Sequence, residues 1–273
     1  MSELVDALAA ARAYDLEQPR FAGAPVFPAH EPGLLVHLHR RHEPDAPEPR
    51  TSASALLVMT EHSGTHIDAL CHQAYAGELH GGVPVSARVQ TSTGFTELGI
   101  DTVAPLIARG VLLDVAGGEP LAPGHAVTAG ELERAAEGIE LRPGDVVLVR
   151  LGSGALWADR PAYEAAGGIG ADGSRWLAER RPLAVGADNL AWDVVGRPDP
   201  ELGSLPGHTI LIVRAGIHII ESLYLEELAA DGVREFGFVC LPLKVRGGTG
   251  SLVRPIALVQ REEDAGRART RRP

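Results

Sequence analysis

The sequence predicts a single α/β domain with a mixed central β-sheet flanked by helices. Short apolar runs rich in Val, Ile and Leu, such as residues 110–115 (GVLLDV) and 145–151 (DVVLVRL), are typical of buried strands. Helical segments occur between such runs, without the regular alternation of a purely parallel fold. No repeat or linker divides the chain, and 273 residues suffice for one large core. We therefore expect one domain over residues 1–261 and a disordered tail over 262–273.

The individual elements follow from local patterns. Residues 2–13 predict a short amphipathic helix. Strands are expected at 34–39 (LLVHLH) and 53–60 (ASALLVMT), separated by a charged, proline-rich surface loop. Thr128 and Glu131 have the spacing of a capping box and predict a helix over 128–138. Further strands are expected at residues 182–187, 208–213, 236–241 and 256–259, and a further helix at 224–231.

Composition and charge exclude several classes of protein. A formal net charge of −11 disfavours binding to nucleic acid or anionic lipid. No apolar run approaches the roughly 20 residues of a membrane helix, and the N-terminus does not resemble a signal peptide. Cys71 and Cys240 are too few for a disulfide framework. We expect a cytoplasmic protein that acts on a small molecule, with a solvated basic tail (Arg267, Arg269, Arg271 and Arg272).

Four potential metal ligands occur within eleven residues: His62, His66, Asp68 and His72. Imidazole and carboxylate groups are the ligands that zinc and manganese take in proteins. Because Gly64 interrupts the segment and a strand precedes it, we expect a turn that aims His62 and His66 at one point. Asp68 then lies on the same side as His66. His72 is interpreted as a proton-transfer residue, since an imidazole titrates near neutral pH. The alternative is four ordinary polar loop residues.

Other candidates lie further along the chain. His208 opens an apolar run and Glu221 follows another, so both could complete the metal site or hold a second metal; a capped or salt-bridged Glu221 is the alternative. Asp188 and Trp192, after a predicted strand, could contact a substrate or form a simple turn with a packing indole. Cys71 is interpreted as a core residue. His218 is expected at the surface, and the remaining histidines are not expected to be ligands (His30, His37, His39, His80 and His125).

The segment from His62 to His72 resembles the HxGTHxDxPxH signature of the cyclase family, which includes kynurenine formamidase and isatin hydrolase. It departs from the signature at Leu70, where proline is usual. The resemblance extends over most of the chain. It implies a swivelling β/β/α fold with a mixed sheet or barrel, a zinc or manganese site, and a homodimer or homotetramer. It also implies that His62, His66 and Asp68 are metal ligands, that His72 transfers protons, and that His208 and Glu221 are further ligands.

The resemblance leaves three functions open. The first is hydrolysis of an amide C–N bond in a small, possibly cyclic or aryl substrate, with His72 as acid and base. The second is ring closure or dehydration of a polyketide-like intermediate by the same groups. The third is a small-molecule binder without catalysis. In each case Phe27 and Trp192 are expected to form flat walls of an otherwise aliphatic pocket.

Overall fold

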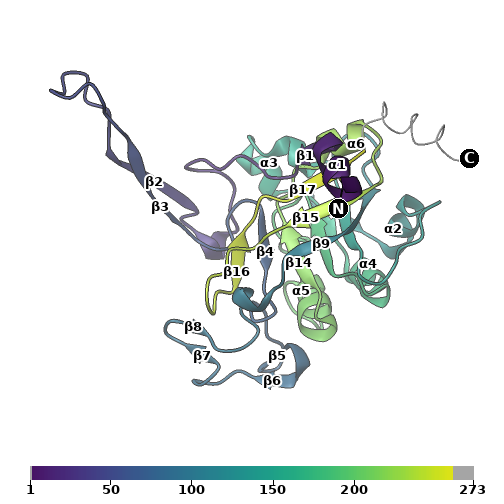
Figure 1. The fold of residues 1–273 in the computed structure, drawn as a ribbon. Coiled ribbons are helices and arrows are strands. Elements are labelled where there is room, and N and C mark those ends of the chain that lie inside the picture. The colour runs from purple at the N-terminus through teal and green to yellow at the C-terminus, as the bar shows by residue number, and fades with distance from the viewer. Residues whose placement is uncertain (1, 261–273) are drawn as a thin grey trace, which may run out of the picture.

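The computed structural model describes residues 2–260 and is built on one mixed sheet of nine strands (Figure 1). The tail expected at 262–273 lies outside the described residues. The central strands β9, β11, β13 and β14 are parallel, and both flanks of the sheet are antiparallel. In sheet order the strands are β1 (Arg12–Asp15), β17 (Ile256–Val259), β15 (Glu235–Cys240), β9 (Leu106–Asp114), β11 (Val146–Arg150), β13 (Ala184–Ala187), β14 (His218–Glu221), β4 (His66–Asp68) and β16 (Gly250–Leu252). The mixed α/β fold class predicted from the sequence is confirmed.

Hydrophobic cores lie on the two faces of this sheet. Alternate residues of β11 divide between them, because successive side chains of a strand point to opposite faces. Val147 and Val149 join one core, and Val146 and Leu148 join the other. Helices α2 (Ala129–Ala135) and α4 (Ala171–Glu179) cover the first face together with the π-helix η5 (Thr209–Ala215), and α6 (Glu226–Ala230) packs on the second. The other helices are α1 (Ser2–Ala10), α3 (Arg160–Glu164) and α5 (Pro206–His208).

The predicted capping box is present at the start of α2. The Thr128 side chain accepts a hydrogen bond from the backbone N–H of Glu131, and the Glu131 carboxylate accepts one from the backbone N–H of Thr128. These bonds satisfy two of the N–H groups that a helix leaves without an internal partner. The local sequence therefore fixes where α2 begins.

The strand predicted over residues 208–213 is wrong, because the chain is helical there. Pro206 stands in the first turn of α5, and η5 continues the helix to Ala215, where Gly216 ends it with a φ of 68°. Ile210, Leu211 and Ile212 are all buried in this helix. A short run that is apolar on every side looks the same in sequence whether it forms a buried strand or a buried helix.

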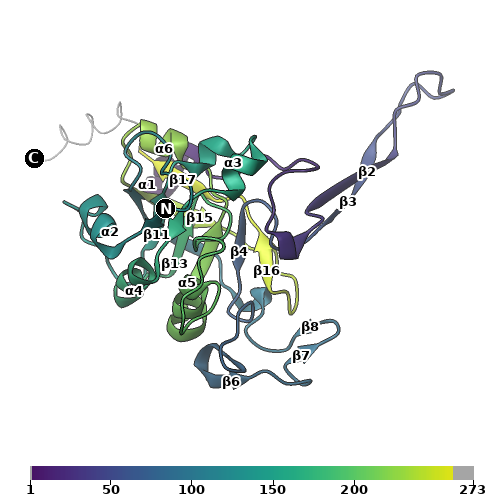
Figure 2. The same ribbon diagram turned by 180° about the vertical axis from the view of Figure 1, so that it is seen from behind.

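One hairpin projects away from the body of the molecule (Figures 1 and 2). Its strands β2 (Leu34–Arg40) and β3 (Ser54–Met59) pair only with each other, and we call residues 34–59 the arm. The smaller elements are the pairs β5 (Glu78–Leu79) with β6 (Val83–Pro84), β7 (Gln90–Thr91) with β8 (Gly94–Phe95) and β10 (Ala126–Val127) with β12 (Gly168–Ile169), and the short helices η1 (Pro28–His30), η2 (His80–Gly82), η3 (Ile100–Thr102) and η4 (Ser153–Leu156). Within residues 2–260, no helix has both the length and the apolar character needed to cross a membrane.

Candidate metal centre

A tight turn between β3 and β4 presents the first histidine of the cluster. Gly64 has a φ of 59° in this turn, and a Cβ atom there would lie 2.6 Å from Nη1 of Arg20. The guanidinium of Arg20 donates hydrogen bonds to the backbone oxygens of Ser63 and Thr65, on both sides of the glycine. Thr65 in turn donates its hydroxyl to the backbone oxygen of Ser222, 2.6 Å away. The Gly-Thr pair therefore holds the turn in place.

Strand β4 brings the next two groups to one face. His66 and Asp68 point the same way, as the sequence predicts, while Ile67 between them enters the core. Glu221 of β14 lies directly opposite His66, and Gly250 of β16 lies opposite Asp68. A Cβ at Gly250 would come within 2.6 Å of Cε1 of His62, so the glycine leaves room for that ring.

The five predicted ligands are brought together at the end of these strands. Nδ1 of His62 lies 2.9 Å from Oδ1 of Asp68. Glu221 lies 3.3 Å from Nε2 of His66 and 3.2 Å from Nε2 of His208. Asp68 is central to the cluster. Its Oδ1 lies 3.6 Å from Nε2 of His66, and its Oδ2 lies 3.6 Å from Nε2 of His208. All five side chains are buried.

The outer nitrogen of each of these three imidazoles has a hydrogen-bond partner. Nδ1 of His66 lies 2.8 Å from the backbone oxygen of Gly64, and Nδ1 of His208 lies 2.8 Å from Oδ2 of Asp193. Nε2 of His62 lies 2.9 Å from the hydroxyl of Thr249, which itself donates to Glu61. These acceptors assign the N–H to the outer nitrogen, so the inner lone pair of each neutral imidazole faces a carboxylate.

This arrangement fits a divalent cation. Buried lone pairs that face carboxylate oxygens repel them unless a proton or a cation lies between. Nδ1 of His62, both oxygens of Asp68 and Oε1 of Glu221 are buried and make no hydrogen bond within the described structure. Nitrogen and oxygen ligands suit zinc and manganese, and fixing the far nitrogen of a histidine is the usual way to orient a ligand.

The carboxylates and imidazoles of the cluster shift one another's pKa values so that the charged form of each is favoured. Burial raises the pKa of Asp68 and of Glu221, but the neighbouring histidines outweigh burial and lower both. Burial lowers the pKa of His66 and of His208, but the neighbouring carboxylates outweigh it and raise both: that of Glu221 for His66, and those of Asp193 and then Glu221 for His208. A site that holds protons this firmly has the electrostatic character of a cation site.

His72 and His30 lie beside His62, and one nitrogen of His72 is within 4.8 Å of atoms of Asp68 and His208. The ring of His72 stacks on His62 with centroids 3.9 Å apart, and burial lowers the pKa of His72 to about 3. Its imidazole is therefore neutral near pH 7. The ring of His30 also stacks on His62, with centroids 4.8 Å apart, and lies 6.0 Å from the ring of His72; burial lowers the pKa of His30 as well. One nitrogen of His30 lies within 4.8 Å of nitrogens of His62 and His72, so His30 stands beside the cluster, although the sequence gave no sign of such neighbours.

Other predicted residues lie elsewhere. Trp192 is fully buried and donates its indole N–H to Ser174. Both oxygens of Asp188 accept backbone N–H groups, from Leu151 and Gly154. The positions of Asp188 and Trp192 therefore give no support to contact with a substrate: the turn with a packing indole, which the sequence left open, describes them better.

Three further predictions concern residues beside the cluster. Phe27 lies next to the site, with its ring 6.0 Å from that of His30. Cys71 is a core residue, as expected, and burial raises its pKa to about 12. His218 was expected at the surface, but it is partly buried and its Nδ1 lies 2.8 Å from the backbone oxygen of Asp68.

The sequence analysis missed the residues that orient the cluster. Asp193 accepts from the ring of His208 and from the backbone N–H groups of Gly207 and His208, and so also caps α5. Glu61 and Thr249 fix His62 from outside. No local pattern marks Asp193, because it stands far before Pro206 in the sequence, whereas a capping residue directly precedes the first residues of its helix.

Comparisons with known proteins agree with this geometry. The sequence profile described as Putative cyclase matches residues 14–194. Kynurenine formamidase of Paracidovorax citrulli is 27% identical over 243 residues, which cover 89% of this chain and 94% of that protein. Isatin hydrolase of Roseibium aggregatum is 27% identical over 246 residues, covering 86% of this chain and 84% of that protein.

Solved structures show the same fold. A crystal structure described as a novel cyclase has a TM-score of 0.81 and 30% identity, covering 93% of this chain and 88% of that chain. An isatin hydrolase bound to the product analogue thioisatinate has a TM-score of 0.73 at 24% identity, covering 95% of this chain and 97% of that chain.

Proposed function

Because this chain belongs to the cyclase family, we propose that it is a metal-dependent hydrolase of an amide C–N bond in a small cyclic or aryl substrate. One observation carries the proposal. Three imidazoles, each with its outer nitrogen hydrogen-bonded, turn their inner nitrogens toward the carboxylates of Asp68 and Glu221. Two relatives of similar length, a kynurenine formamidase and an isatin hydrolase, support an amide as substrate.

The proposed ligands are His62, His66, Asp68, His208 and Glu221. Zinc or manganese bound there would polarise the substrate carbonyl and make water more acidic. Asp68 has one oxygen toward His62 and the other toward His208, and these contacts suit either a single ion or a pair. All five side chains are buried, and the outer hydrogen bonds of the three imidazoles hold those rings in position while a substrate enters.

His72 is the proposed proton carrier. Its ring lies against that of His62 and close to Asp68 and His208, where it can take a proton from the water that attacks the carbonyl carbon and then give that proton to the nitrogen as the C–N bond breaks. The products are a carboxylic acid and an amine, which remain joined in one molecule if the amide was cyclic. Phe27, beside His30 at the partly buried edge of the site, is proposed to lie against the flat ring of the substrate.

The test separates metal binding from proton transfer. The purified protein is analysed for zinc and manganese and assayed with aryl formamides, isatins and cyclic imides. We expect His66→Ala to lose metal and turnover together, and His72→Gln to keep metal but lose most turnover. Turnover that survives in His66→Ala, or a wild-type protein that binds neither metal, contradicts the proposal. Tight binding of a panel member without turnover would favour a binder instead.

Ring closure or dehydration is the second candidate, favoured by the 30%-identical structure described as a cyclase. The same residues would then move a proton between carbon and oxygen. This candidate predicts no amide hydrolysis across the panel but metal-dependent loss of water from a polyketide-like compound.

A further inference from the structure

A large cleft lies on the body of the molecule, apart from the metal centre. It encloses about 980 Å³, which is room for a sizeable small molecule. Its walls come from residues 15–20, residues 154–158 in and after η4, residues 224–227 at the start of α6, and Arg254 before β17. Within the described structure, none of the proposed metal ligands lines this cleft, and neither does His72. The proposed hydrolase activity therefore leaves the cleft without a role.

Gln18 presents an unpaired acceptor to the cleft. The residue is only 2% exposed, and its Nε2 donates to the backbone oxygens of Gly154 and Leu223, at 3.0 and 3.4 Å. These two carbonyl partners assign the nitrogen of the amide to that side. The amide oxygen, Oε1, lies on the other side, where it accepts no hydrogen bond from the described residues. Because Gln18 lines the cleft, this oxygen is available to an occupant.

Glu226 offers a second acceptor close to the amide of Gln18. Its Oε2 accepts hydrogen bonds from Nε and Nη2 of Arg150, at 3.0 and 2.6 Å, whereas its Oε1 is buried and has no partner among the described residues. A Cβ added at Gly154 would lie 3.3 Å from Nε2 of Gln18 and 3.4 Å from Oε1 of Glu226, so both groups adjoin this glycine. A buried carboxylate oxygen is costly without a donor. An N–H group beside Gly154 would supply one.

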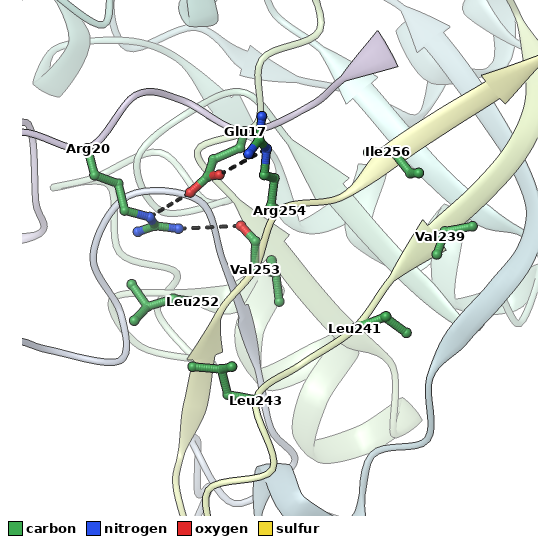
Figure 3. A pocket seen from close by; sticks show the side chains of 9 residues that line it. All are labelled: Glu17, Arg20, Val239, Leu241, Leu243, Leu252, Val253, Arg254 and Ile256. Atoms are coloured by element: carbon green, nitrogen blue, oxygen red, sulfur yellow. Dashed lines mark hydrogen bonds and ion pairs between the residues drawn. The ribbon is translucent and has the colours of Figure 1, made fainter. Parts of the chain in front are cut away.

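The side-chain nitrogen donors around the cleft already have partners. Glu17 lies between the guanidinium groups of Arg20 and Arg254, at 2.7 and 3.7 Å (Figure 3). Arg20 also donates to two backbone oxygens, and Arg254 pairs with Asp15 at 2.7 Å. Nε1 of Trp157 donates to a backbone oxygen as well. The cleft therefore suits a ligand that donates hydrogen bonds better than an anion, which needs donors.

The charge of the cleft is negative. Two guanidinium groups line it against four carboxylates, those of Asp15, Glu17, Glu226 and Glu227. The guanidinium groups pair with Asp15 and Glu17, so the surplus belongs to Glu226 and Glu227. Arg150 offsets only part of it, because Arg150 also pairs with Asp114. A surplus of one sign within the walls of a cleft concentrates ligands of the opposite charge.

We propose that this cleft binds an organic cation that carries a primary ammonium or guanidinium group. The charged group donates to Oε1 of Gln18 and to Glu226, and the apolar part of the ligand lies against Pro19, Ala155 and Ala158. An ammonium group has three donors and no acceptor, which matches free acceptors and occupied donors. The cleft is far larger than a metal ion, so its occupant has a body as well as a charge. The proposal does not depend on the hydrolase activity.

Isothermal titration calorimetry with benzylamine tests the proposal on the full chain with its metal bound. Benzyl alcohol is the matched neutral probe, because it has the same ring and no charge. We expect benzylamine to bind and benzyl alcohol to give no measurable heat of binding. The affinity for benzylamine should fall as salt is added, since salt screens the attraction between exposed charges.

Two substitutions at one position should shift the affinity in opposite directions. Ala155 lines the cleft and is exposed, so a longer side chain there does not disturb the core. Ala155→Lys should weaken benzylamine binding by about 3–5-fold, and Ala155→Glu should strengthen it by a similar factor. Ala104→Lys and Ala104→Glu are the matched controls, because Ala104 is exposed and lies outside the cleft. These controls change the net charge equally and should leave the affinity unchanged.

The metal centre is the rival site for an amine, because an amine nitrogen can ligate a metal. Wild-type protein treated with a chelator should therefore bind benzylamine as before. Binding that disappears with the metal would place the amine at the metal centre and overturn the proposal. A wild type that does not bind benzylamine, equal binding of benzyl alcohol, or an affinity that neither substitution of Ala155 alters would overturn it as well.

Discussion

Asp193 holds His208 by its outer nitrogen, at 2.8 Å, and so directs the inner nitrogen toward Asp68 and Glu221. The same carboxylate accepts the backbone N–H groups of Gly207 and His208. Asp193 thus fixes both the helix α5, which carries His208, and the rotation of the His208 ring.

Replacing Asp193 should weaken metal binding, although Asp193 is not one of the proposed metal ligands. We expect Asp193→Asn to lower metal affinity by about 10–100-fold, because the amide cannot hold the ring and the helix start as the carboxylate does. Titration against a competing chelator measures this. Asp159→Asn, at the cap of α3, is the matched control and should leave affinity unchanged. Equal affinities in the wild type and Asp193→Asn would show that His208 is oriented by packing alone.

Metal removal should lower the thermal stability of the protein. A bound cation offsets the free-energy cost of burying carboxylates and imidazoles together, and a chelator removes that offset. At a metal concentration about 100 times the dissociation constant, binding adds about 2.7 kcal/mol to the free energy of unfolding. That corresponds to a rise of about 5–10 °C in Tm for a chain of this size. Calorimetry with and without chelator checks it, and the Tm of His66→Ala should not respond to metal.

Gly64→Ala should destabilise the turn for two separate reasons. A left-handed conformation costs a residue with a side chain about 1–2 kcal/mol, and the new Cβ would lie 2.6 Å from Nη1 of Arg20. Gly77→Ala separates the two effects, because Gly77 also has a positive φ but nothing within 4 Å of an added Cβ. Urea unfolding should show the larger loss for Gly64→Ala. Equal losses would mean that Arg20 moves aside at no cost.

Asp188 should make stability fall as the pH rises. Burial raises its pKa to about 7, against the opposing effect of two backbone N–H groups, while the ordinary value is 3.8. The folded chain thus keeps a proton that the unfolded chain releases, and this contribution is lost between about pH 4 and 7. Asp188→Asn lacks the titration. Its destabilisation relative to wild type should be smaller at pH 8 than at pH 5, by about 2–3 kcal/mol at about 1.4 kcal/mol per pKa unit. A difference that stays constant with pH would contradict this.

The sequence is informative where structure depends on near neighbours. The capping box of Thr128 and Glu131 depends on residues three apart, and the alternation of His66 and Asp68 depends on the pleat of one strand. The members of the predicted ligand set are concentrated in one segment and at the ends of apolar runs, and the fold brings these side chains together. Their spacing in the sequence is a local signal.

Sequence analysis failed where a role arises from contacts between distant segments. His30 joins the cluster only because η1 packs beside a turn more than thirty residues later, and no local pattern marks it. The helix at residues 209–215 begins with a run of consecutive buried residues, from Thr209 to Ile212, and such a run shows no helical period in its hydrophobicity. For Trp192 the sequence left open a flat wall of the substrate pocket or a packing indole, and its ring is fully buried in the core.

The two strands of the arm enter the body beside two stacked histidines. β2 begins at Leu34, just after His30, and β3 ends at Met59, just before His62, and these two rings are 4.8 Å apart. The base of the arm is therefore continuous with the two segments that carry these rings, one of which faces Asp68. Shortening the hairpin removes no predicted ligand, yet it changes the segment that joins the two rings in the chain. Protein engineers who trim this loop for crystallisation should expect to change the chemistry as well as the shape.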